Sequence, residues 1–118
     1  MSKIQIWHNP RCSKSRNALQ FLEEEGVDAE VVKYLDMPHS KEEIKNLISM
    51  LGLSFARDLM RTKEEVYKTL DLKNIEDEEK LIEAMVENPR LIERPIVIKD
   101  TKAAIGRPIE KIIDLVRG

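Results

Sequence analysis

The first 35 residues combine two strand patterns with one helical pattern, and this order constrains the fold more than any other feature. Ile4 and Ile6 alternate with polar neighbours and predict a short strand. From Ser13 onward the apolar residues fall on one helical face, and Gly26 is a typical residue after a helix end. Residues 27–35 predict a second strand. A strand, a helix and a strand in succession predict a βαβ unit with parallel strands.

The middle of the chain has the apolar spacing of helices. Ser40 followed by Glu43 forms a capping box before a helical run that ends at Gly52. Further helices are predicted at residues 54–61, at 63–70, and after an acidic start at 75–79, with Pro89 ending the last of them. We interpret this stretch, about residues 38–90, as a helical insertion.

The end of the chain returns to strand patterns. Residues 96–98 predict a buried strand, residues 103–105 its hairpin partner, and Pro108 the start of a last helix. The sequence therefore predicts an α/β fold with a mixed sheet, in which the insertion separates a βαβ half from a ββα half. The 118 residues contain no repeat, low-complexity tract or linker, so we expect a single domain over residues 1–118.

The charge balance argues against some classes of partner. Charged residues make up 36% of the chain, yet the net charge is only −2, so the basic excess typical of nucleic-acid binding is missing. No apolar run approaches the roughly 20 residues of a membrane helix. Met1, Ser2 and Lys3 lead directly into a strand rather than into a signal peptide. We therefore expect neither a nucleic acid nor a membrane as partner.

Cys12 is the only cysteine, and it lies where the first strand passes into the first helix. One cysteine cannot form an internal disulfide, and one cysteine with two distant histidines offers no ligand set for zinc. These features predict a soluble protein of a reducing compartment, the cytoplasm, without a metal. For any single free cysteine, a buried and inert thiol is the alternative interpretation.

The position of Cys12 favours a reactive thiolate. A free cysteine has a pKa of about 8.5, so ionising half of it at neutral pH requires about 2.7 kcal/mol of stabilisation. A helix N-terminus supplies only about 0.3–1 kcal/mol, or about 2 kcal/mol in partly buried sites. A nearby cation must therefore supply the rest. Arg11, Lys14 and Arg16 flank the thiol in the sequence and add positive field.

Five runs of residues carry a resemblance to a known family. They are His8-Asn9-Pro10-Arg11-Cys12-Ser13-Lys14-Ser15-Arg16, Leu59-Met60-Arg61, Ala84-Met85-Val86-Glu87-Asn88-Pro89, Glu93-Arg94-Pro95-Ile96-Val97 and Ile105-Gly106-Arg107-Pro108. In order and spacing they resemble the glutaredoxin-linked arsenate reductase family over nearly the whole chain. The chain looks closest to the short members that lack a C-terminal tail. The resemblance implies a thioredoxin-like (glutaredoxin-like) three-layer fold with a helical insertion.

The resemblance also implies that Cys12 is the nucleophile and that two neighbours support its thiolate. His8, as an imidazolium, would lower the pKa of the thiol, and Ser15 would donate a hydrogen bond to the thiolate. The alternative for His8 is a solvated histidine in a turn, and for Ser15 an ordinary serine in the first turn of a helix.

Three arginines are implied to bind an oxyanion substrate: Arg61, Arg94 and Arg107. Guanidinium groups match tetrahedral oxyanions in a two-pronged fashion and remain charged, which agrees with that role. Arg94 and Arg107 each precede a proline, and the resemblance implies that Pro95 is cis and faces Cys12. The alternative for each arginine is a solvated surface residue.

The implied reaction is arsenate reduction without a bound cofactor. The Cys12 thiolate attacks arsenate, glutathione then attacks the adduct as co-substrate, and glutaredoxin resolves the mixed disulfide as arsenite is released. Ser15 stands where a Cys-x-x-Cys motif would have its second cysteine. With no resolving thiol in the chain, the reducing power must come from another molecule.

Two other functions are weighed against this one. The first is a non-enzymatic regulator of the same fold that binds RNA polymerase, although many such regulators carry a Cys-x-x-Cys switch that is missing here. The second is a general glutathione-dependent thiol reductase, in which Cys12 matters but Arg94 hardly does. The arsenate reductases related to low-molecular-weight tyrosine phosphatases require Cys-x5-Arg, and Ala18 at the sixth position after Cys12 excludes that class.

Overall fold

The computed structural model describes residues 3–106 and 109–117. The chain divides into two compact units, of which the first holds residues 1–36 and 94–118 and the second residues 37–93. The predicted helix start at Pro108 lies outside the described residues. The interpretation of the whole chain as one domain with an insertion stays a prediction.

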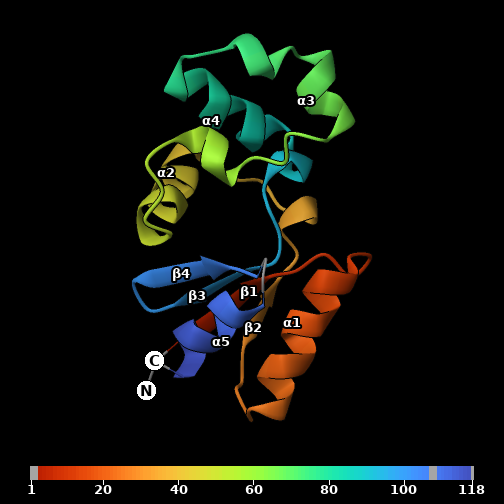
Figure 1. Cartoon of the computed structure of the whole chain (residues 1–118), viewed down its shortest axis with the longest axis vertical. Helices are drawn as coiled ribbons and strands as arrows, with labels where there is room; N and C mark the ends of the chain where they lie inside the picture. The colour runs from red at the N-terminus through yellow and green to blue at the C-terminus, as the bar shows by residue number, and fades with distance from the viewer. Residues whose placement is uncertain (1–2, 107–108, 118) are drawn as a thin grey trace. The chain divides into compact units, whose positions relative to one another are not determined.

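The first unit contains a mixed four-stranded sheet in the order β2-β1-β3-β4 (Figure 1). Strand β1 pairs in parallel with β2 and antiparallel with β3, and β3 pairs antiparallel with β4. The strands are β1 (Ile4–Trp7), β2 (Glu30–Val32), β3 (Ile96–Lys99) and β4 (Lys102–Ile105). The predicted parallel pair, the mixed sheet and the terminal hairpin are therefore confirmed.

Two helices pack against one face of this sheet and form its core. They are α1 (Ser13–Glu24) and α5 (Glu110–Arg117). Five fully buried residues form the central cluster: Ile6, Ala18, Leu22, Val97 and Ile112. Ile6 and Val97 are directly paired across β1 and β3, so they point to the same face of the sheet. Burial of apolar area at about 25 cal/mol per Å² is the main force that holds α1 and α5 in place.

The second strand is much shorter than the sequence predicts. The pattern over residues 27–35 predicts a strand, but β2 covers only Glu30–Val32, and a 3-10 turn, η1, follows at Tyr34–Asp36. In this turn the Tyr34 side chain is fully buried and stacks on Trp7. A strand and a turn that buries one aromatic ring show the same pattern of apolar residues. The sequence of residues 27–35 therefore could not distinguish a continuous strand from a short strand followed by a turn.

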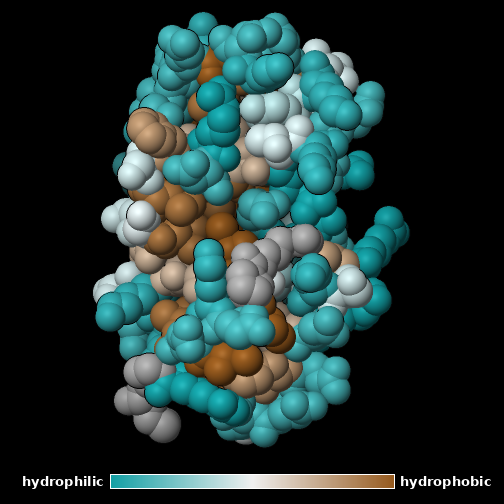
Figure 2. All heavy atoms as spheres, viewed as in Figure 1, coloured by the Kyte–Doolittle hydropathy of each residue, from teal (hydrophilic) through white to brown (hydrophobic). Residues whose placement is uncertain are grey.

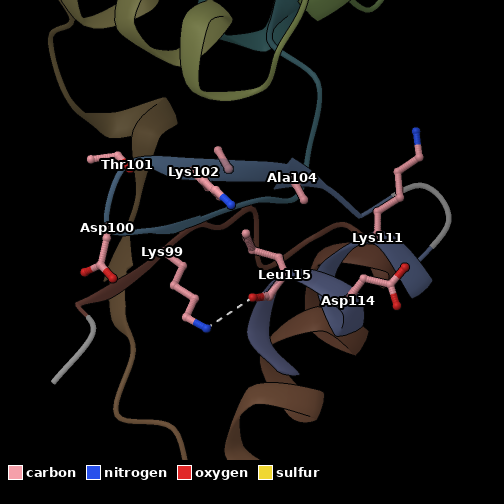
Figure 3. Close-up of a pocket in the computed structure, with 9 residues that line it drawn as sticks. Lys99, Asp100, Thr101, Lys102, Ala104, Lys111, Asp114 and Leu115 are labelled. Atoms are coloured by element: carbon pink, nitrogen blue, oxygen red, sulfur yellow. Dashed lines mark hydrogen bonds between the residues drawn. The ribbon is translucent and has the colours of Figure 1, made fainter. Parts of the chain in front are cut away.

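The C-terminal end of α5 is held by a side chain from the sheet. The Lys99 ammonium donates a hydrogen bond to the Leu115 carbonyl oxygen at 3.4 Å (Figure 3). It donates a second one to the Val116 carbonyl oxygen at 3.2 Å. The last carbonyls of a helix lack partners within the helix and carry partial negative charge, so a lysine there is stabilising. Lys99 thus ties α5 to β3 and helps fix the first unit.

The second unit is helical. It contains α2 (Lys41–Met50), η2 (Ala56–Leu59), α3 (Glu65–Thr69), η3 (Leu72–Asn74), α4 (Glu78–Glu87) and η4 (Pro89–Leu91). The predicted cap of α2 is present, since the Ser40 hydroxyl accepts a hydrogen bond from the Glu43 N–H at 3.1 Å. The helix predicted at residues 54–61 is only the 3-10 turn η2. Its end is extended because Met60 pairs with Ile92 in an antiparallel bridge.

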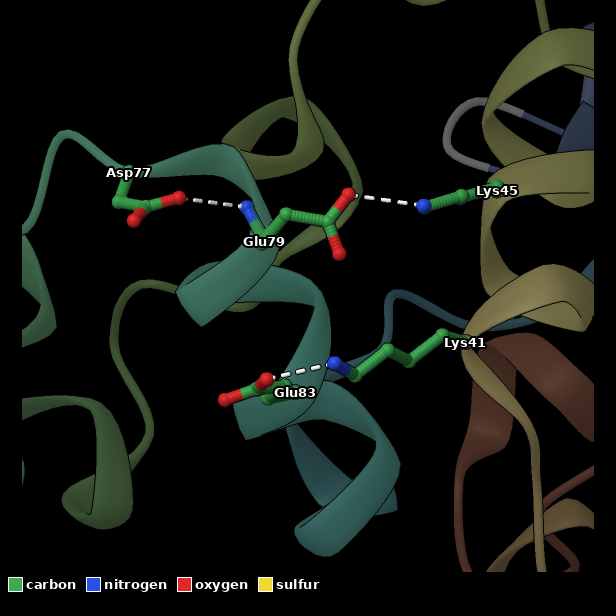
Figure 4. A network of polar contacts seen from close by, with 5 residues as sticks. All are labelled: Lys41, Lys45, Asp77, Glu79 and Glu83. Carbon is green, nitrogen blue, oxygen red and sulfur yellow. Dashed lines mark hydrogen bonds and ion pairs between the residues drawn. The ribbon is translucent and has the colours of Figure 1, made fainter.

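Helices α2 and α4 are linked on their surface by two parallel ion pairs. Lys41 lies 2.6 Å from Glu83, and Lys45 lies 2.7 Å from Glu79 (Figure 4). All four side chains are about half exposed, so water screens these pairs and they add little to stability. Packing of the buried apolar residues, among them Ile44, Leu47, Leu81 and Met85, stabilises this unit instead.

Hydrophilic side chains cover much of the face drawn in Figure 2, in keeping with the high content of charged residues. Within residues 3–106 and 109–117, no helix has the length and apolar character needed to span a membrane.

Candidate active site

Cys12 occupies the N-cap of α1, and a tight turn places it there. The Cys12 N–H donates to the Asn9 carbonyl at 3.0 Å, and the Asn9 side chain accepts from the Arg11 N–H at 3.0 Å. Asn9 therefore stabilises a turn, and α1 begins directly after it at Ser13. The sulfur consequently lies at the positive end of a twelve-residue helix.

The surroundings of Cys12 favour its ionised form. Burial of this residue, which is 9% exposed, opposes ionisation. A hydrogen bond from the Arg94 side chain, hydrogen bonds from the backbone N–H groups of Ser15 and Lys14, and the charge of Arg94 outweigh it. The net effect lowers the pKa of the Cys12 thiol below its ordinary value. A lowered pKa increases the fraction of thiolate, which is the reactive form that a nucleophilic cysteine requires.

Arg94 reaches Cys12 because of the strand register. Trp7 is paired with Ile96 at the end of β1, so Arg94, two residues before Ile96, lies at the same edge of the sheet as the start of α1. The Arg94–Pro95 bond is cis, as predicted. Burial opposes the charge on Arg94, but hydrogen bonds and charge interactions with Cys12 and Tyr34 raise its pKa. The guanidinium therefore remains charged beside the thiol.

The Ser15 hydroxyl has a different position from the one predicted. It is fully buried, accepts a hydrogen bond from the Asn9 N–H at 3.0 Å and lies 2.9 Å from Nδ1 of His8. The hydrogen bond from Ser15 that lowers the pKa of Cys12 comes from its backbone N–H. The hydroxyl thus ties the turn to β1, while the backbone supports the thiolate.

The surroundings of His8 do not favour the imidazolium form that was expected from the sequence. Only 7% of the residue is exposed, and this burial lowers its pKa. The hydrogen bond with Ser15 acts in the opposite direction, whereas the charges of Arg16 and Lys33 lower the pKa further. The lowered pKa of His8 favours the neutral imidazole over the imidazolium that the resemblance implied. The residue fixes the turn before Cys12, because its N–H donates to Val32 at 2.9 Å and its ring contacts Ser15.

Arg61 belongs to the second unit and is held there by two carboxylates. Its Nε lies 3.1 Å from Oε1 of Glu64, and one Nη lies 3.6 Å from Oε1 of Glu93. The Arg61 N–H also donates to the Leu91 carbonyl at 2.7 Å. The Arg61 side chain is 20% exposed. It is therefore not a solvated surface residue, which was the alternative interpretation from the sequence. Arg107 lies outside the described residues.

Tyr34 is the residue that the sequence analysis missed at this site. Its ring stacks on Trp7 with centroids 5.7 Å apart, and its charge interaction with Arg94 helps to raise the pKa of that arginine. The signal in the sequence was weak, since a tyrosine in a strand-like run resembles any core residue. Among the described residues, no group of three or more His, Cys, Asp and Glu side chains could hold a metal ion.

The fold and this site define a class of protein. A βαβ half and a ββα half form one mixed sheet, a cysteine caps the first helix, and a cis-proline opens the third strand. This is the thioredoxin-like fold with one cysteine in place of two. The chain belongs to the ArsC family, whose model matches residues 7–115.

Individual relatives agree with this assignment. The chain is 53% identical to an arsenate reductase of Neisseria meningitidis serogroup A over 113 residues, which cover 95% of this chain and 97% of the relative. It is 50% identical to an uncharacterised protein of Escherichia coli K12, covering 97% of both chains. The structure of an arsenate reductase from Vibrio cholerae matches with a TM-score of 0.92 at 46% identity, covering 95% of this chain and 96% of that one.

Proposed function

We propose that the protein is an arsenate reductase in which Cys12 is the nucleophile. The observation that carries this proposal is the hydrogen bond between the Arg94 guanidinium and the Cys12 thiol, at the N-terminus of a helix. This contact supports the proposal, because attack on a tetrahedral oxyanion requires a stabilised thiolate and a cation that can bind the oxyanion beside it. The names of the relatives from Neisseria meningitidis and Vibrio cholerae support the substrate.

In the first step the Cys12 sulfur forms a bond to arsenic. One arsenic–oxygen bond breaks, and that oxygen leaves as water after taking up protons. Arg94 binds the remaining oxygens and neutralises their charge, so the anionic thiolate can approach an anionic substrate. The N–H groups of Ser15 and Lys14 stabilise the thiolate before attack.

The reduction requires two further thiols. Glutathione attacks the Cys12 adduct, and glutaredoxin resolves the mixed disulfide, so that two electrons pass from thiols to arsenic and arsenite is released. The chain cannot provide these thiols, because Cys12 is its only cysteine and Ser15 takes the place of a second one. Glutathione is therefore the proposed co-substrate, glutaredoxin the proposed partner, and no resident cofactor is required.

Arg61 and Arg107 are proposed as additional oxyanion ligands. For Arg107 the proposal rests on its place between Gly106 and Pro108 in the sequence. For Arg61 it must account for Glu64 and Glu93, which already neutralise the guanidinium. An arginine with two carboxylate partners binds an anion more weakly than a solitary one, so Arg94 is the principal ligand in this proposal.

A coupled assay tests the proposal. Wild type, Cys12→Ser and Arg94→Ala are compared for arsenate turnover in the presence of glutathione and glutaredoxin. We expect turnover by the wild type, none by Cys12→Ser, and kcat/KM reduced by about 100-fold or more in Arg94→Ala, the scale for loss of an oxyanion ligand.

Two outcomes of this assay, taken together with the pKa of Cys12 from the pH dependence of its alkylation, would contradict the proposal. If the wild type has an ordinary thiol pKa and no turnover, the protein is not an arsenate reductase. If Arg94→Ala turns over as fast as the wild type while Cys12→Ser is inactive, the protein is a general glutathione-dependent thiol reductase.

A further inference from the structure

We propose that Arg16 binds a carboxylate of the thiol co-substrate and thereby directs the incoming sulfur toward Cys12. The ligand class is a thiol that carries carboxylate groups, and glutathione carries two of them. The proposal rests on the proposed function for the step in which glutathione attacks the Cys12 adduct. It assigns Arg16 a direct contact with the co-substrate, beyond the positive field expected from the sequence.

The segment around Cys12 is basic, although the chain as a whole is slightly acidic. The net charge of the chain is −2, yet residues 1–22 contain no aspartate or glutamate. They contain four basic residues: Lys3, Arg11, Lys14 and Arg16. The last three of these flank Cys12 in the sequence. A surface with this charge attracts anionic partners and raises their local concentration.

Arg16 lies beside the turn that carries Cys12, and two hydrogen bonds hold it there. Its backbone N–H donates to the Cys12 carbonyl at 3.0 Å, so the two residues are one helical turn apart on the same side of α1. Its Nη1 donates to the Pro10 carbonyl at 3.0 Å. Because the guanidinium is already held beside this turn, less conformational entropy is lost when it binds a ligand.

The Arg16 guanidinium is available to an anion from solution. The residue is exposed, and the contact with Pro10 uses one of the five N–H donors of a guanidinium. Within residues 3–106 and 109–117 Arg16 forms no ion pair with a carboxylate, whereas Arg61 and Arg117 each have a glutamate partner. An arginine binds a carboxylate with two parallel N–H···O hydrogen bonds, so a carboxylate is the group that this cation fits.

The need for a second thiol indicates which carboxylate Arg16 binds. Cys12 is the only cysteine, so the sulfur that attacks its adduct must belong to another molecule. Arg94 is the principal oxyanion ligand in the proposed function, which leaves Arg16 for the second reactant. A carboxylate bound to Arg16 holds the thiol of the same molecule close to Cys12 and makes the attack effectively intramolecular.

Thiol–disulfide exchange tests this contact without arsenate. Cys12 is first converted into its mixed disulfide with pyridinethiol by reaction with dipyridyl disulfide. The glutathione thiolate then attacks Sγ of Cys12 and forms a new S–S bond. The bond to the pyridyl sulfur breaks, and pyridinethione leaves with the electron pair and takes up a proton. The absorbance of pyridinethione gives the rate constant, which is also measured for glutathione dimethyl ester, in which both carboxylates are blocked.

The readout is the ratio of the rate constants for glutathione and for its ester in each protein. We expect Arg16→Gln to lower this ratio several-fold, because it removes the partner of the carboxylate while the reaction of the ester continues as in the wild type. Added salt should lower the ratio in the wild type and have less effect in Arg16→Gln. In the turnover assay, the KM for glutathione should increase and the KM for arsenate should not.

Two results for Arg16→Gln would overturn the proposal. The first is a ratio equal to that of the wild type, because the arginine would then make no contact with the carboxylates. The second is an equal decrease of the rate constants for glutathione and for the ester, because Arg16 would then only shape the turn before Cys12.

Arg11→Gln is the matched control, since it removes the same charged group next to Cys12. Arg11 is exposed, and among the described residues its guanidinium has no hydrogen-bond partner that would hold it at the turn. We expect a ratio close to that of the wild type, and an equal decrease in both variants would overturn the proposal in favour of a general positive field. Because the exchange needs no arsenate, absence of arsenate turnover in the wild type would reject the proposed function without deciding the role of Arg16.

Discussion

The guanidinium of Arg94 donates a hydrogen bond to the thiol of Cys12, although the two residues come from opposite halves of the sheet. The antiparallel pairing of β1 with β3 brings them together, because it sets the end of β1 beside the start of β3. The Cys12 sulfur lies at the partial positive charge of the N-terminus of its own helix, α1. It also interacts with the full positive charge of Arg94, which is distant in the sequence. The lowered pKa of Cys12 therefore depends on tertiary structure, which brings together groups that are distant in the sequence.

Replacing Arg94 by alanine removes the strongest of the side-chain contacts that ionise Cys12. We expect the pKa of the thiol to increase and its alkylation at neutral pH to slow several-fold. The reason is that burial raises this pKa, and the variant lacks the arginine that lowers it. The pH dependence of iodoacetamide alkylation measures this. Arg11→Ala is the control, because Arg11 is exposed and next to Cys12 in the sequence. An equal effect of both variants would show that general positive field, rather than the contact of Arg94, ionises the thiol.

The ionised thiol of Cys12 contributes to stability in a defined direction of pH. Its pKa is lower in the folded chain than in the unfolded chain. The contribution is therefore fully present above the ordinary cysteine pKa and is lost as the pH falls through the lowered value. We expect the free energy of unfolding of wild type relative to Cys12→Ser to increase with pH across that window. Urea unfolding of both proteins at a series of pH values measures it, and parallel curves would contradict it.

His8 should make the protein less stable in mild acid. Burial lowers its pKa, so the unfolded chain takes up a proton before the folded chain does as the pH falls. Its contribution to stability is complete above the ordinary histidine pKa, about 6.5, and decreases as the pH falls toward the lowered value. In His8→Asn, which retains a polar group near Ser15, we expect a flatter dependence of unfolding free energy on pH. The same slope in both proteins would show that His8 titrates normally.

Gly106 occupies a position without room for a side chain. A β-carbon there would lie 2.5 Å from Cδ1 of Ile112 and 2.8 Å from Cγ of Pro95. We expect Gly106→Ala to destabilise the fold by about 1–3 kcal/mol, the usual cost of overpacking. Thermal or urea unfolding measures this loss. Gly26→Asn is the control, since that position is open and asparagine tolerates its positive φ of 71°. It should be nearly neutral, and a similar cost at both sites would contradict the steric explanation.

Arg61 should stabilise the helical unit whether or not it binds substrate. Glu64 and Glu93 are 17% and 24% exposed, so removing their shared cation leaves two partly buried carboxylates close together. We expect Arg61→Ala to cost about 1–3 kcal/mol of unfolding free energy, as for a lost partner of a charged group. Adding Glu64→Gln should recover part of that loss, because it removes one of the two negative charges. Simple additivity of the two substitutions would contradict this coupling.

Local patterns were sufficient for the order of the elements and for the position of the thiol. Alternation over Ile4 and Ile6, the helical face after Ser13 and the hairpin after residue 98 depend on neighbours in sequence, so they could be predicted. The motif residues then led to the ArsC family, which the family model confirmed. The roles given to the site residues remain predictions. The imidazolium expected at His8 is not favoured in the structure, because burial, which a sequence does not show, lowers the pKa of this histidine.

The position of a lone cysteine at the start of a helix, after a buried strand, could be predicted from the sequence. Which groups act on this cysteine depends on the tertiary structure. The register of β1 with β3 brings Arg94 to the edge of the sheet where Cys12 lies, and the early end of β2 places the Tyr34 ring on Trp7. These contacts join residues far apart in the chain, and their strength depends on burial and orientation. Neither quantity is a property of a short stretch of sequence.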